Sequence, residues 1–416
     1  MTRRPSAWKP WPRFAALLVL ALALLLGAAA PAAAWQDFSF LALGDTRTEP
    51  YLAGGRDQAA RMKQILRQRY RTEAKLFFTP DGSTLERAEF QHKGARYTLY
   101  YQNGWPERIE LTKHGATRTI MRAAGRRWVY REMLKDIRSG APLPEEGARF
   151  ILHGGDLVLN GYLGTSPQSP YWGLLKKELL DRLPPADAAL GLPGRVMVCV
   201  GNHETWEDPK LAGLLGTMPW LRELGLGEKN RIYAVDYQNC RFIFLDTGGY
   251  SPLGTRWLGR YPPFKAQMAY LRRLLKDAVI QGLDHVVVLF HKPAFVKVGH
   301  DPLPAGQNPH YLLKGFAPLI DILVINSHTH TTERYQVDGV NYLVLGAGGA
   351  PQKFKPCRHP SPQAELYWRG KPRVEEYNYL KVDVKGKEMV GWLHRWRPGG
   401  GKPHGRWVEF FRSRTP

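Results

Sequence analysis

Short apolar runs alternate with longer amphipathic stretches along most of the chain. Seven runs of four to six residues, bounded by Gly, Asp, Asn or Pro, predict buried β-strands over residues 38–43, 150–153, 196–200, 242–245, 285–290, 322–326 and 342–345. Between them, apolar residues at helical spacing predict amphipathic helices near residues 62–70, 129–137 and 271–279. This alternation predicts an α/β fold whose sheets are buried between helices.

One segment, residues 76–125, breaks the alternation. Its turn-like clusters contain glycines at intervals of 12, 10 and 11 residues, at Gly82, Gly94, Gly104 and Gly115. Asn103-Gly104 is a strong hairpin signal, and the residues between the turns alternate in polarity. We therefore expect an antiparallel β-meander inserted into the α/β domain.

The N-terminus has the features of an export signal. A basic region with Arg3 and Arg4 precedes an apolar run from Phe14 to about Ala30, and small residues follow at 32–34. This pattern predicts a signal peptide over residues 1–34, cleaved before Trp35 to give a periplasmic or secreted protein. An uncleaved membrane anchor is the alternative interpretation. No other stretch is long and apolar enough for a span, so we expect no stable membrane span after cleavage.

The chain is strongly basic. Removal of residues 1–34, which carry four basic and no acidic side chains, lowers the formal charge from +22 to +18. Such a surface attracts anions, which include phosphorylated substrates, nucleic acid, acidic lipid surfaces and anionic envelope polymers, although it is equally compatible with simple solubilisation. The basic segment 395–416 contains a run of glycines and is expected to form a mobile tail. Three cysteines without a CxxC pair give no support to a thiolate metal site.

Polar motifs directly follow five of the predicted strands. They are Gly44-Asp45, Gly155-Asp156, Gly201-Asn202-His203-Glu204, Phe290-His291 and Ser327-His328-Thr329-His330. In open α/β sheets, ligands bind at the carboxyl ends of strands, so these loops should converge on one place. Carboxylates, an amide and imidazoles suit a pair of divalent cations such as Mn, Fe, Zn or Mg. A two-ion centre of this kind can hydrolyse a phosphate ester.

The order of these motifs resembles that of the calcineurin-like metallophosphoesterases, a family that includes purple acid phosphatases and many phosphodiesterases. The resemblance covers most of the chain from residue 35 onward outside the insert, and it implies a four-layer α-β-β-α sandwich. It further implies that Asp156 bridges two ions. The remaining implied ligands are Asp45 and His330 for the first ion, and Asn202, His291 and His328 for the second. His203 is implied to face the leaving group or stabilise the transition state.

Two positions depart from the family pattern. Arg47 stands where the family usually has a histidine, and Leu159 stands where purple acid phosphatases have a tyrosine. A guanidinium stays protonated and does not bind metals. Our hypothesis is that Arg47 contacts the substrate phosphate in a bidentate manner; a surface arginine without a catalytic part is the alternative.

The sequence therefore predicts a metal-dependent hydrolase of a phosphomonoester or phosphodiester, acting by in-line attack of metal-bound hydroxide. Motifs for a serine nucleophile elbow, a zinc protease helix, a phosphate-binding loop and a dinucleotide fold are absent from the sequence. The alternative is a cell-envelope binding protein on a degenerate phosphoesterase scaffold, holding anionic polymers with its basic surface.

Overall fold

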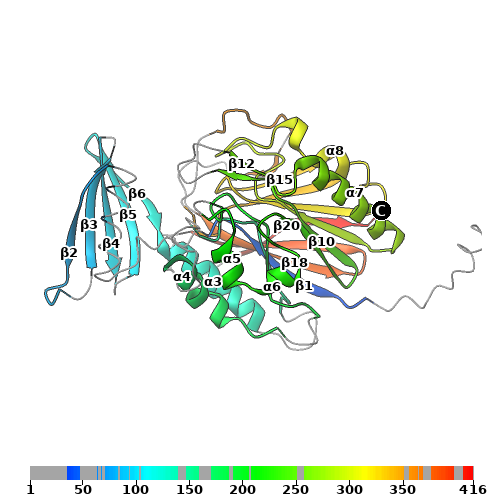
Figure 1. Ribbon diagram of the computed structural model, residues 1–416, viewed down its shortest axis with the longest axis horizontal. Helices are drawn as coiled ribbons and strands as arrows, with labels where there is room; N and C mark the ends of the chain where they lie inside the picture. The colour runs from blue at the N-terminus through cyan, green and yellow to red at the C-terminus, as the bar shows by residue number, and fades with distance from the viewer. Residues whose placement is uncertain are drawn as a thin grey trace, which may run out of the picture. The chain divides into compact units, whose positions relative to one another are not determined.

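Most strands of the computed structural model belong to two large sheets, and each of the seven predicted apolar runs forms a strand of one of them (Figure 1). The first sheet contains, in spatial order, β20 (Arg406–Arg414), β19 (Glu388–Trp396), β18 (Tyr377–Lys385), β1 (Phe38–Leu43), β7 (Ile151–His153) and β8 (Val196–Val198). The second sheet contains β17 (Glu365–Trp368), β15 (Thr332–Val337), β16 (Val340–Leu345), β14 (Asp321–Asn326), β13 (His285–Leu289), β10 (Cys240–Phe244) and β9 (Tyr233–Tyr237).

The structure describes most, but not all, of the chain. The described residues are 35–46, 63, 67, 71–82, 85–92, 94–102, 105–138, 147–158, 170–186, 191–205, 208–250, 257–350, 356–363, 365–368, 376–397 and 406–415. The expected signal peptide lies outside them, and so do Arg47 and Leu159. Of the expected helix near 62–70, the structure describes residues 63 and 67. Among the described residues, no helix combines the length and the apolar character needed to span a membrane.

Parallel pairing within each large sheet places the carboxyl ends of neighbouring strands at the same edge. Strands β1, β7 and β8 are parallel neighbours, as are β10, β13, β14 and β16. Every residue of β1, β10, β13, β14 and β16 is buried, which explains why these strands are continuous apolar runs in the sequence. The predicted motifs follow the carboxyl ends of five of these parallel strands, β1, β7, β8, β13 and β14.

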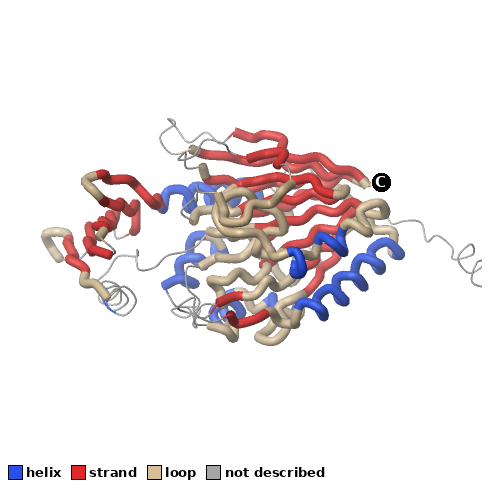
Figure 2. The backbone as a smooth tube through the Cα atoms, turned by 90° about the horizontal axis from the view of Figure 1, so that it is seen from above, coloured by secondary structure: helices blue, strands red, loops and turns tan. Residues whose placement is uncertain are grey.

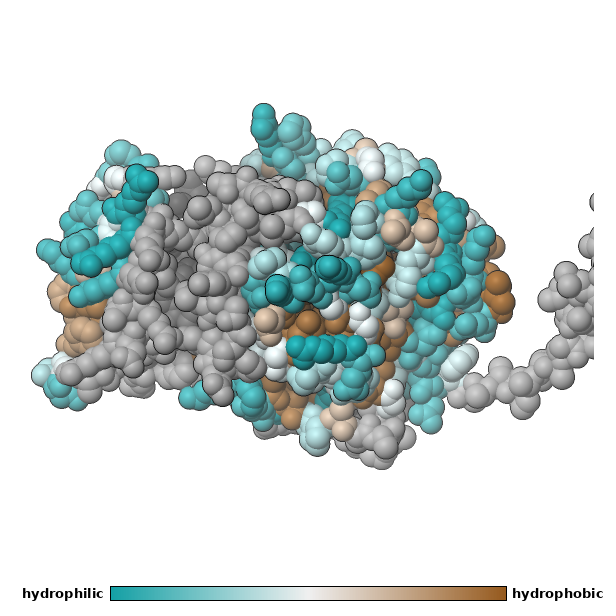
Figure 3. Space-filling view, viewed as in Figure 1, coloured by the Kyte–Doolittle hydropathy of each residue, from teal (hydrophilic) through white to brown (hydrophobic). Residues whose placement is uncertain are grey.

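Helices enclose the two sheets, and the predicted mixed α/β class is confirmed (Figure 2). A large core combines side chains from both sheets with α3 (Ala123–Arg138), α4 (Pro170–Glu178), α5 (Ala212–Thr217) and α6 (Trp220–Glu223). A second core packs α7 (Phe264–Ile280) and α8 (His310–Leu313) against the second sheet. On the face seen in Figure 3, hydrophilic side chains predominate among the described residues, because the apolar ones fill these cores.

Aromatic rings occupy the space between the two sheets. Phe40 of β1 lies parallel to Phe150 at a centroid distance of 5.9 Å, and Phe242 of β10 meets both rings edge-on at 5.4 and 5.3 Å. All three side chains are fully buried. Because Phe40 and Phe242 belong to different sheets, this contact helps fix the position of one sheet on the other, at about 0.5–1.5 kcal/mol per aromatic pair beyond area burial.

A separate five-stranded antiparallel sheet occupies the segment expected to form a meander. Its strands follow one another in chain order as β2 (Ala74–Phe78), β3 (Leu85–His92), β4 (Ala95–Gln102), β5 (Trp105–Lys113) and β6 (Ala116–Arg122). One face carries a small apolar cluster that includes Ala88 and Leu99. The sheet runs from Ala74 to Arg122. It therefore starts before the expected range 76–125, and the end of that range, from Ala123 onward, belongs to α3.

The expectation of a mobile basic tail over residues 395–416 is wrong for much of that segment. Residues 406–414 form β20, which pairs antiparallel with β19 from Arg395↔Arg406 to Glu388↔Arg414. Phe410 and Phe411 are 3% and 1% exposed, so the strand is held by buried aromatic side chains despite its three arginines. Because basic residues flank the two buried phenylalanines, the segment does not stand out as a strand in the sequence.

Two strand-end glycines make room for a serine that joins the sheets. Ser327 follows β14 of the second sheet, and its side chain packs against the ends of β1 and β7. A Cβ added at Gly44 would lie 1.8 Å from Ser327 Oγ, and one at Gly154 would lie 2.0 Å from it. The backbone at both positions therefore requires glycine for steric reasons, directly beside Asp45 and Asp156.

Replacing Gly154 by alanine should lower the free energy of unfolding by roughly 1–3 kcal/mol, because the added methyl group overpacks this contact. In the double variant Gly154→Ala/Ser327→Gly, the oxygen and Cβ that the methyl group meets are removed, and much of the loss should be recovered. Chemical denaturation of the two single variants and the double variant measures this coupling. Purely additive effects would contradict the steric explanation.

Candidate metal centre

The two predicted aspartates leave neighbouring strands of the first sheet in the same unusual conformation. Asp45 follows β1 with a φ of 53°, Asp156 follows β7 with a φ of 58°, and both are fully buried. The backbone N–H of Asp45 donates a hydrogen bond to Gly155 O at 3.1 Å, which ties the two loops together. The left-handed turns direct both carboxylates to the edge where the strands end.

The second sheet supplies histidines to the same edge. His291 follows β13, and His328 and His330 follow β14 with φ values of 72° and 57°. The side chains form two groups, Asp156–His291–His328 and Asp45–Asp156–His330, and within each group the potential ligand atoms lie within 4.8 Å of one another. Asp156 belongs to both groups. This is the arrangement needed for two cations that share one carboxylate.

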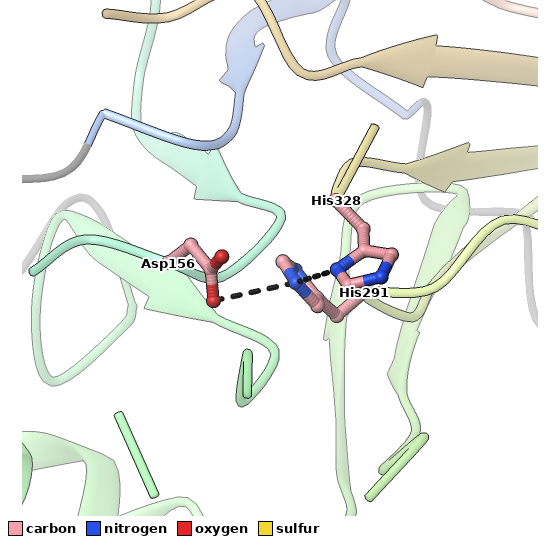
Figure 4. Close-up of side chains that lie close together, drawn as sticks. All are labelled: Asp156, His291 and His328. Atoms are coloured by element: carbon pink, nitrogen blue, oxygen red, sulfur yellow. Dashed lines mark hydrogen bonds and ion pairs between the residues drawn. The ribbon is translucent and has the colours of Figure 1, made fainter. Parts of the chain in front are cut away.

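His291 is the centre of the first group (Figure 4). Its Nδ1 donates to Gly154 O at 2.8 Å, so Nε2 is the ring atom available to a ligand. That Nε2 lies 3.3 Å from Asp156 Oδ1, 3.0 Å from His328 Nδ1 and 3.1 Å from Asn202 Oδ1. Potential ligand atoms of Asp156, Asn202, His291 and His328, which follow four different strands, therefore lie close together. Such a set of nitrogen and oxygen ligands suits a divalent cation.

The electrostatics of these histidines reflect the buried carboxylates around them. Burial alone would lower the pKa of His291, but the negative charges of Asp156 and Asp45 and the hydrogen bond to Gly154 raise it to about 9. His328 shows the opposite effect: burial and the neighbouring His291 and His300 lower its pKa well below the usual value. A bound cation would replace the positive charge that the protein otherwise places on His291.

The Gly201–Thr205 loop completes this side of the centre. Asn202 is 6% exposed and presents Oδ1 to His291, as expected for the neutral ligand of the second ion. His203 is 4% exposed; its backbone N–H donates to Asp156 Oδ1 at 3.0 Å, and its Nε2 lies 3.6 Å from Asp156 Oδ2. The imidazole therefore borders the centre beside the bridging carboxylate.

Glu204 holds the loops of Asp156 and Asn202 in place. Its fully buried carboxylate accepts backbone hydrogen bonds from Asp156 at 2.8 Å, Leu157 at 2.7 Å, Val158 at 3.4 Å and Gly201 at 2.9 Å. Burial and the charge of Asp156 raise its pKa, while these backbone N–H groups act in the opposite direction. Glu204 therefore ties the segment after β7 to the segment after β8.

His153, the last residue of β7, is a fully buried, packed residue. Its Nδ1 accepts the backbone N–H of Gly155 at 3.1 Å, so Nε2 carries the proton and donates to Thr46 Oγ1 at 3.1 Å. Burial lowers the pKa of His153 to about 3, which keeps the ring neutral. Arg47, the next residue after Thr46, lies outside the described residues, so its contact with a phosphate stays a prediction.

Sequence reasoning missed three features near the centre. The Gly346–Ala350 loop after β16 closes over Asp45, with Ala350 N donating to Asp45 O at 2.7 Å; a Cβ at Gly346 would lie 2.6 Å from Asp45 Oδ2. Its Gly-Ala-Gly-Gly pattern after an apolar run was a usable signal. The exposed His300 stacks on His328 at a ring distance of 4.5 Å. It follows no strand, so no periodicity marked it.

Glu333 is the third missed feature. This fully buried carboxylate accepts hydrogen bonds from Lys297 N at 2.8 Å, Thr331 Oγ1 at 2.8 Å and Tyr335 OH at 2.5 Å. It therefore joins the segment leading to His300 with the end of the His328–His330 loop. In the sequence it is one glutamate within a strand of mixed polarity, with nothing to distinguish it from a surface residue.

Comparisons with known proteins give the family of the chain. The family model of the calcineurin-like phosphoesterases matches residues 114–332, a range that contains all the proposed ligands except Asp45. The comparison with curated proteins returned no match.

Solved structures show distant similarity to the chain. A dimetal phosphatase from Danio rerio is 13% identical, with a TM-score of 0.46 and coverage of 91% of this chain and 99% of that one. GAP50, the anchor in the inner membrane complex of Plasmodium, is 12% identical, with a TM-score of 0.40 and coverage of 90% of both chains. Vps29 from Chaetomium thermophilum is 11% identical, with a TM-score of 0.27 and coverage of 69% and 87%.

The family uses a dinuclear metal site, for which this chain has two candidate ligand groups. Since the family model matches just over half of its residues, the chain belongs to the calcineurin-like phosphoesterases.

Proposed function

We propose that this protein hydrolyses a phosphomonoester or phosphodiester with two divalent cations held by Asp45, Asp156, Asn202, His291, His328 and His330. The observation that carries the proposal is the pair of buried ligand groups that share Asp156. Family membership supports metal-dependent phosphoester hydrolysis in general. Bound there, the cations would supply Lewis-acid activation of a phosphate oxygen and of the attacking water.

The protein's own residues would position the reactants and manage protons. Asp45 and His330 would hold the first cation and Asn202, His291 and His328 the second, and Asp156 belongs to both ligand groups. His203, at the rim beside Asp156, is placed to donate a proton to the leaving alkoxide or to stabilise charge on the phosphoryl group. Bulk water would have restricted access to the centre, because the ligand side chains other than His328 are less than a tenth exposed.

The hydrogen bonds inside the protein keep the ligands ready for their role. The Nδ1–H···O=C bond from His291 to Gly154 fixes the tautomer that leaves Nε2 as the donor atom. Glu204 holds the backbone of Asp156 through its N–H group, so that Oδ1 is aimed at His291 and at the N–H of His203. Such outer partners typically change metal affinity or activity about 10–100-fold when replaced.

Asp156→Asn should abolish manganese-dependent hydrolysis of a chromogenic phosphomonoester and phosphodiester, with a loss greater than the roughly 100-fold that outer partners cause. The physical reason is that one substitution removes a negative ligand from both ions. The matched control is Asp236→Asn, which alters a half-exposed aspartate paired with Arg241 on the surface. Steady-state kinetics of metal-stripped and reloaded protein gives the measurement.

The same experiment separates the hydrolase from an envelope-binding protein on a degenerate scaffold. If the wild-type protein binds metal and an anionic polymer but hydrolyses neither ester, and if Asp156→Asn leaves polymer binding intact, the hydrolase proposal is wrong.

Glu204→Gln should reduce manganese affinity and kcat about 10–100-fold while the fold persists. Glutamine keeps the shape of the side chain, but its amide NH₂ cannot accept the backbone N–H groups that one carboxylate oxygen accepts. Without those hydrogen bonds, the Asp156 loop loses its fixed position. Glu178→Gln, which alters a glutamate bound to Arg126, is the control. Metal titration and kinetics that match the wild type would contradict this role of Glu204.

We also propose that the protein is exported and that residues 1–34 are removed. The support is the basic region, apolar run and small-residue site of the N-terminus. N-terminal sequencing of the protein recovered outside the cytoplasmic membrane should begin at Trp35. Recovery of a chain that starts at Met1 and stays with the membrane would support the uncleaved anchor instead.

A further inference from the structure

The helix layer over the outer face of the second sheet carries a row of exposed cations. Helices α7 and α8 both pack apolar side chains into the second core (Figure 1). The side chains of α7 that point away from this core share one face of the helix, because they recur at helical spacing. Four of them, called the basic ridge below, are exposed cations: Lys265, Arg272, Arg273 and Lys276.

The basic ridge forms no ion pair within the described part of the chain. The one acidic residue of α7, Asp277, is half-buried on the flank of the helix. Asp236, on the neighbouring strand β9, accepts two hydrogen bonds from the guanidinium of Arg241, both at 2.7 Å. Beside α8, Asp338 pairs with Lys314 at 3.4 Å. The carboxylates closest to the ridge therefore have other cationic partners or point aside.

The net charge of the layer is positive when every one of these carboxylates is included. Residues 260–284 and 309–320, which form the layer, contain six lysines and arginines and two aspartates. Adding Arg241, Asp236 and Asp338 from the strands beneath gives seven cations and four carboxylates. Such a surface attracts an anionic partner, and the attraction is strongest along the unpaired ridge.

The three most exposed large apolar side chains of the described residues lie on the same layer. Ile280, Tyr311 and Leu319 are 82%, 63% and 59% exposed. Ile280 lies one helical turn after Lys276 on the exposed face of α7, Tyr311 belongs to α8, and Leu319 lies in the loop between α8 and β14. Single exposed apolar side chains are ordinary, but three on one layer beside a row of cations indicate an interaction surface.

Ile280 and Leu319 lie at the amino edge of the second sheet. Residues 281–284 join α7 to β13, and Leu319 precedes the start of β14 by two residues. The two connections run next to each other, because β13 and β14 are parallel neighbours and Asp321 N donates to Asp284 O at 3.3 Å. The proposed histidine ligands follow the opposite ends of these strands. A partner bound to this layer would therefore leave the candidate metal centre uncovered.

A partner of this layer must offer negative charge and also a place for apolar side chains. A hydrated anionic polymer, such as a nucleic acid, offers the charge but gives Ile280 and Leu319 no favourable environment. The surface of a membrane offers both. Anionic headgroups attract lysine and arginine, and exposed aliphatic and aromatic side chains enter the boundary between headgroups and acyl chains.

We propose that the outer layer formed by α7 and α8 binds the surface of a membrane that contains anionic phospholipid. The basic ridge contacts headgroup phosphates, and Ile280, Tyr311 and Leu319 enter the interfacial region. This contact needs no membrane-spanning segment. It is independent of the proposed hydrolytic function, because no ligand of the metal centre takes part in it.

The test measures co-sedimentation of the protein with vesicles of phosphatidylcholine, with and without phosphatidylglycerol. It uses the chain from Trp35 onward, which keeps the whole compact unit 37–416 and lacks the apolar N-terminal run that would bind vesicles by itself. The wild type should bind the anionic vesicles, and added salt should weaken binding by screening. The double variant Arg272→Gln/Lys276→Gln should bind them roughly tenfold more weakly or worse, because two cations next to the surface are lost.

Two further variants separate insertion and local charge from net charge. Ile280→Ser should weaken binding to the anionic vesicles severalfold, because it removes an inserted side chain and leaves the charge unchanged. The charge-matched control, Lys176→Gln/Lys177→Gln, removes two exposed cations from α4, which packs on the first sheet. This control should bind like the wild type. All the substituted side chains are exposed, so the fold should persist in every variant.

A wild-type protein that stays in the supernatant with anionic vesicles would overturn the proposal. Equal losses in the ridge variant and the α4 control would also overturn it, since net charge alone would then explain the binding. The third contrary result concerns a polymer as the partner. If the ridge variant loses binding to soluble polyphosphate while Ile280→Ser binds vesicles like the wild type, the layer binds an anionic polymer and the assignment to a membrane is wrong.

Discussion

The buried carboxylate of Glu204 is the constraint on which the metal centre depends. It accepts hydrogen bonds from the backbone N–H groups of two loops. Asp156, Leu157 and Val158 donate from the loop after β7, and Gly201 donates from the loop after β8. Hydrogen bonds to a charged group are worth about 1.5–3 kcal/mol each, and a buried carboxylate without them would be strongly destabilising. The chain therefore adopts the one loop arrangement that satisfies Glu204, and this arrangement aims Asp156 at His291.

The backbone at the ligands is strained, which explains the need for such constraints. Four of the proposed ligands, Asp45, Asp156, His328 and His330, have φ values between 53° and 72°. For residues other than glycine this region costs of order 1–3 kcal/mol each and persists only where the surroundings enforce it. Glu204 enforces it at Asp156, and Glu333 braces the segment directly after His330. Ser327, wedged against Gly44 and Gly154, keeps the two sheets in contact between these points.

Charge is distributed unevenly around the centre. The two ligand groups combine the carboxylates of Asp45 and Asp156 with imidazoles, a set that attracts cations. The overall excess of positive charge, +18 without residues 1–34, would add long-range attraction for anionic phosphate esters.

The sequence by itself predicted the parallel strands and the candidate ligands. Strands such as β1 and β14 are buried on both faces, so each is an uninterrupted apolar run, and the polar residues that follow each run lie at the carboxyl edge of the sheet. These strand-end motifs carry the resemblance to the phosphoesterase family, which implied Asp45, Asp156, Asn202, His291, His328 and His330 as ligands without coordinates. Only the tertiary structure decided the outer strands, including β20, because an edge strand of mixed polarity is defined by the neighbour it pairs with. It likewise decided the partners of Glu204 and Glu333, because these contacts join residues from distant segments and leave no periodic trace in the sequence.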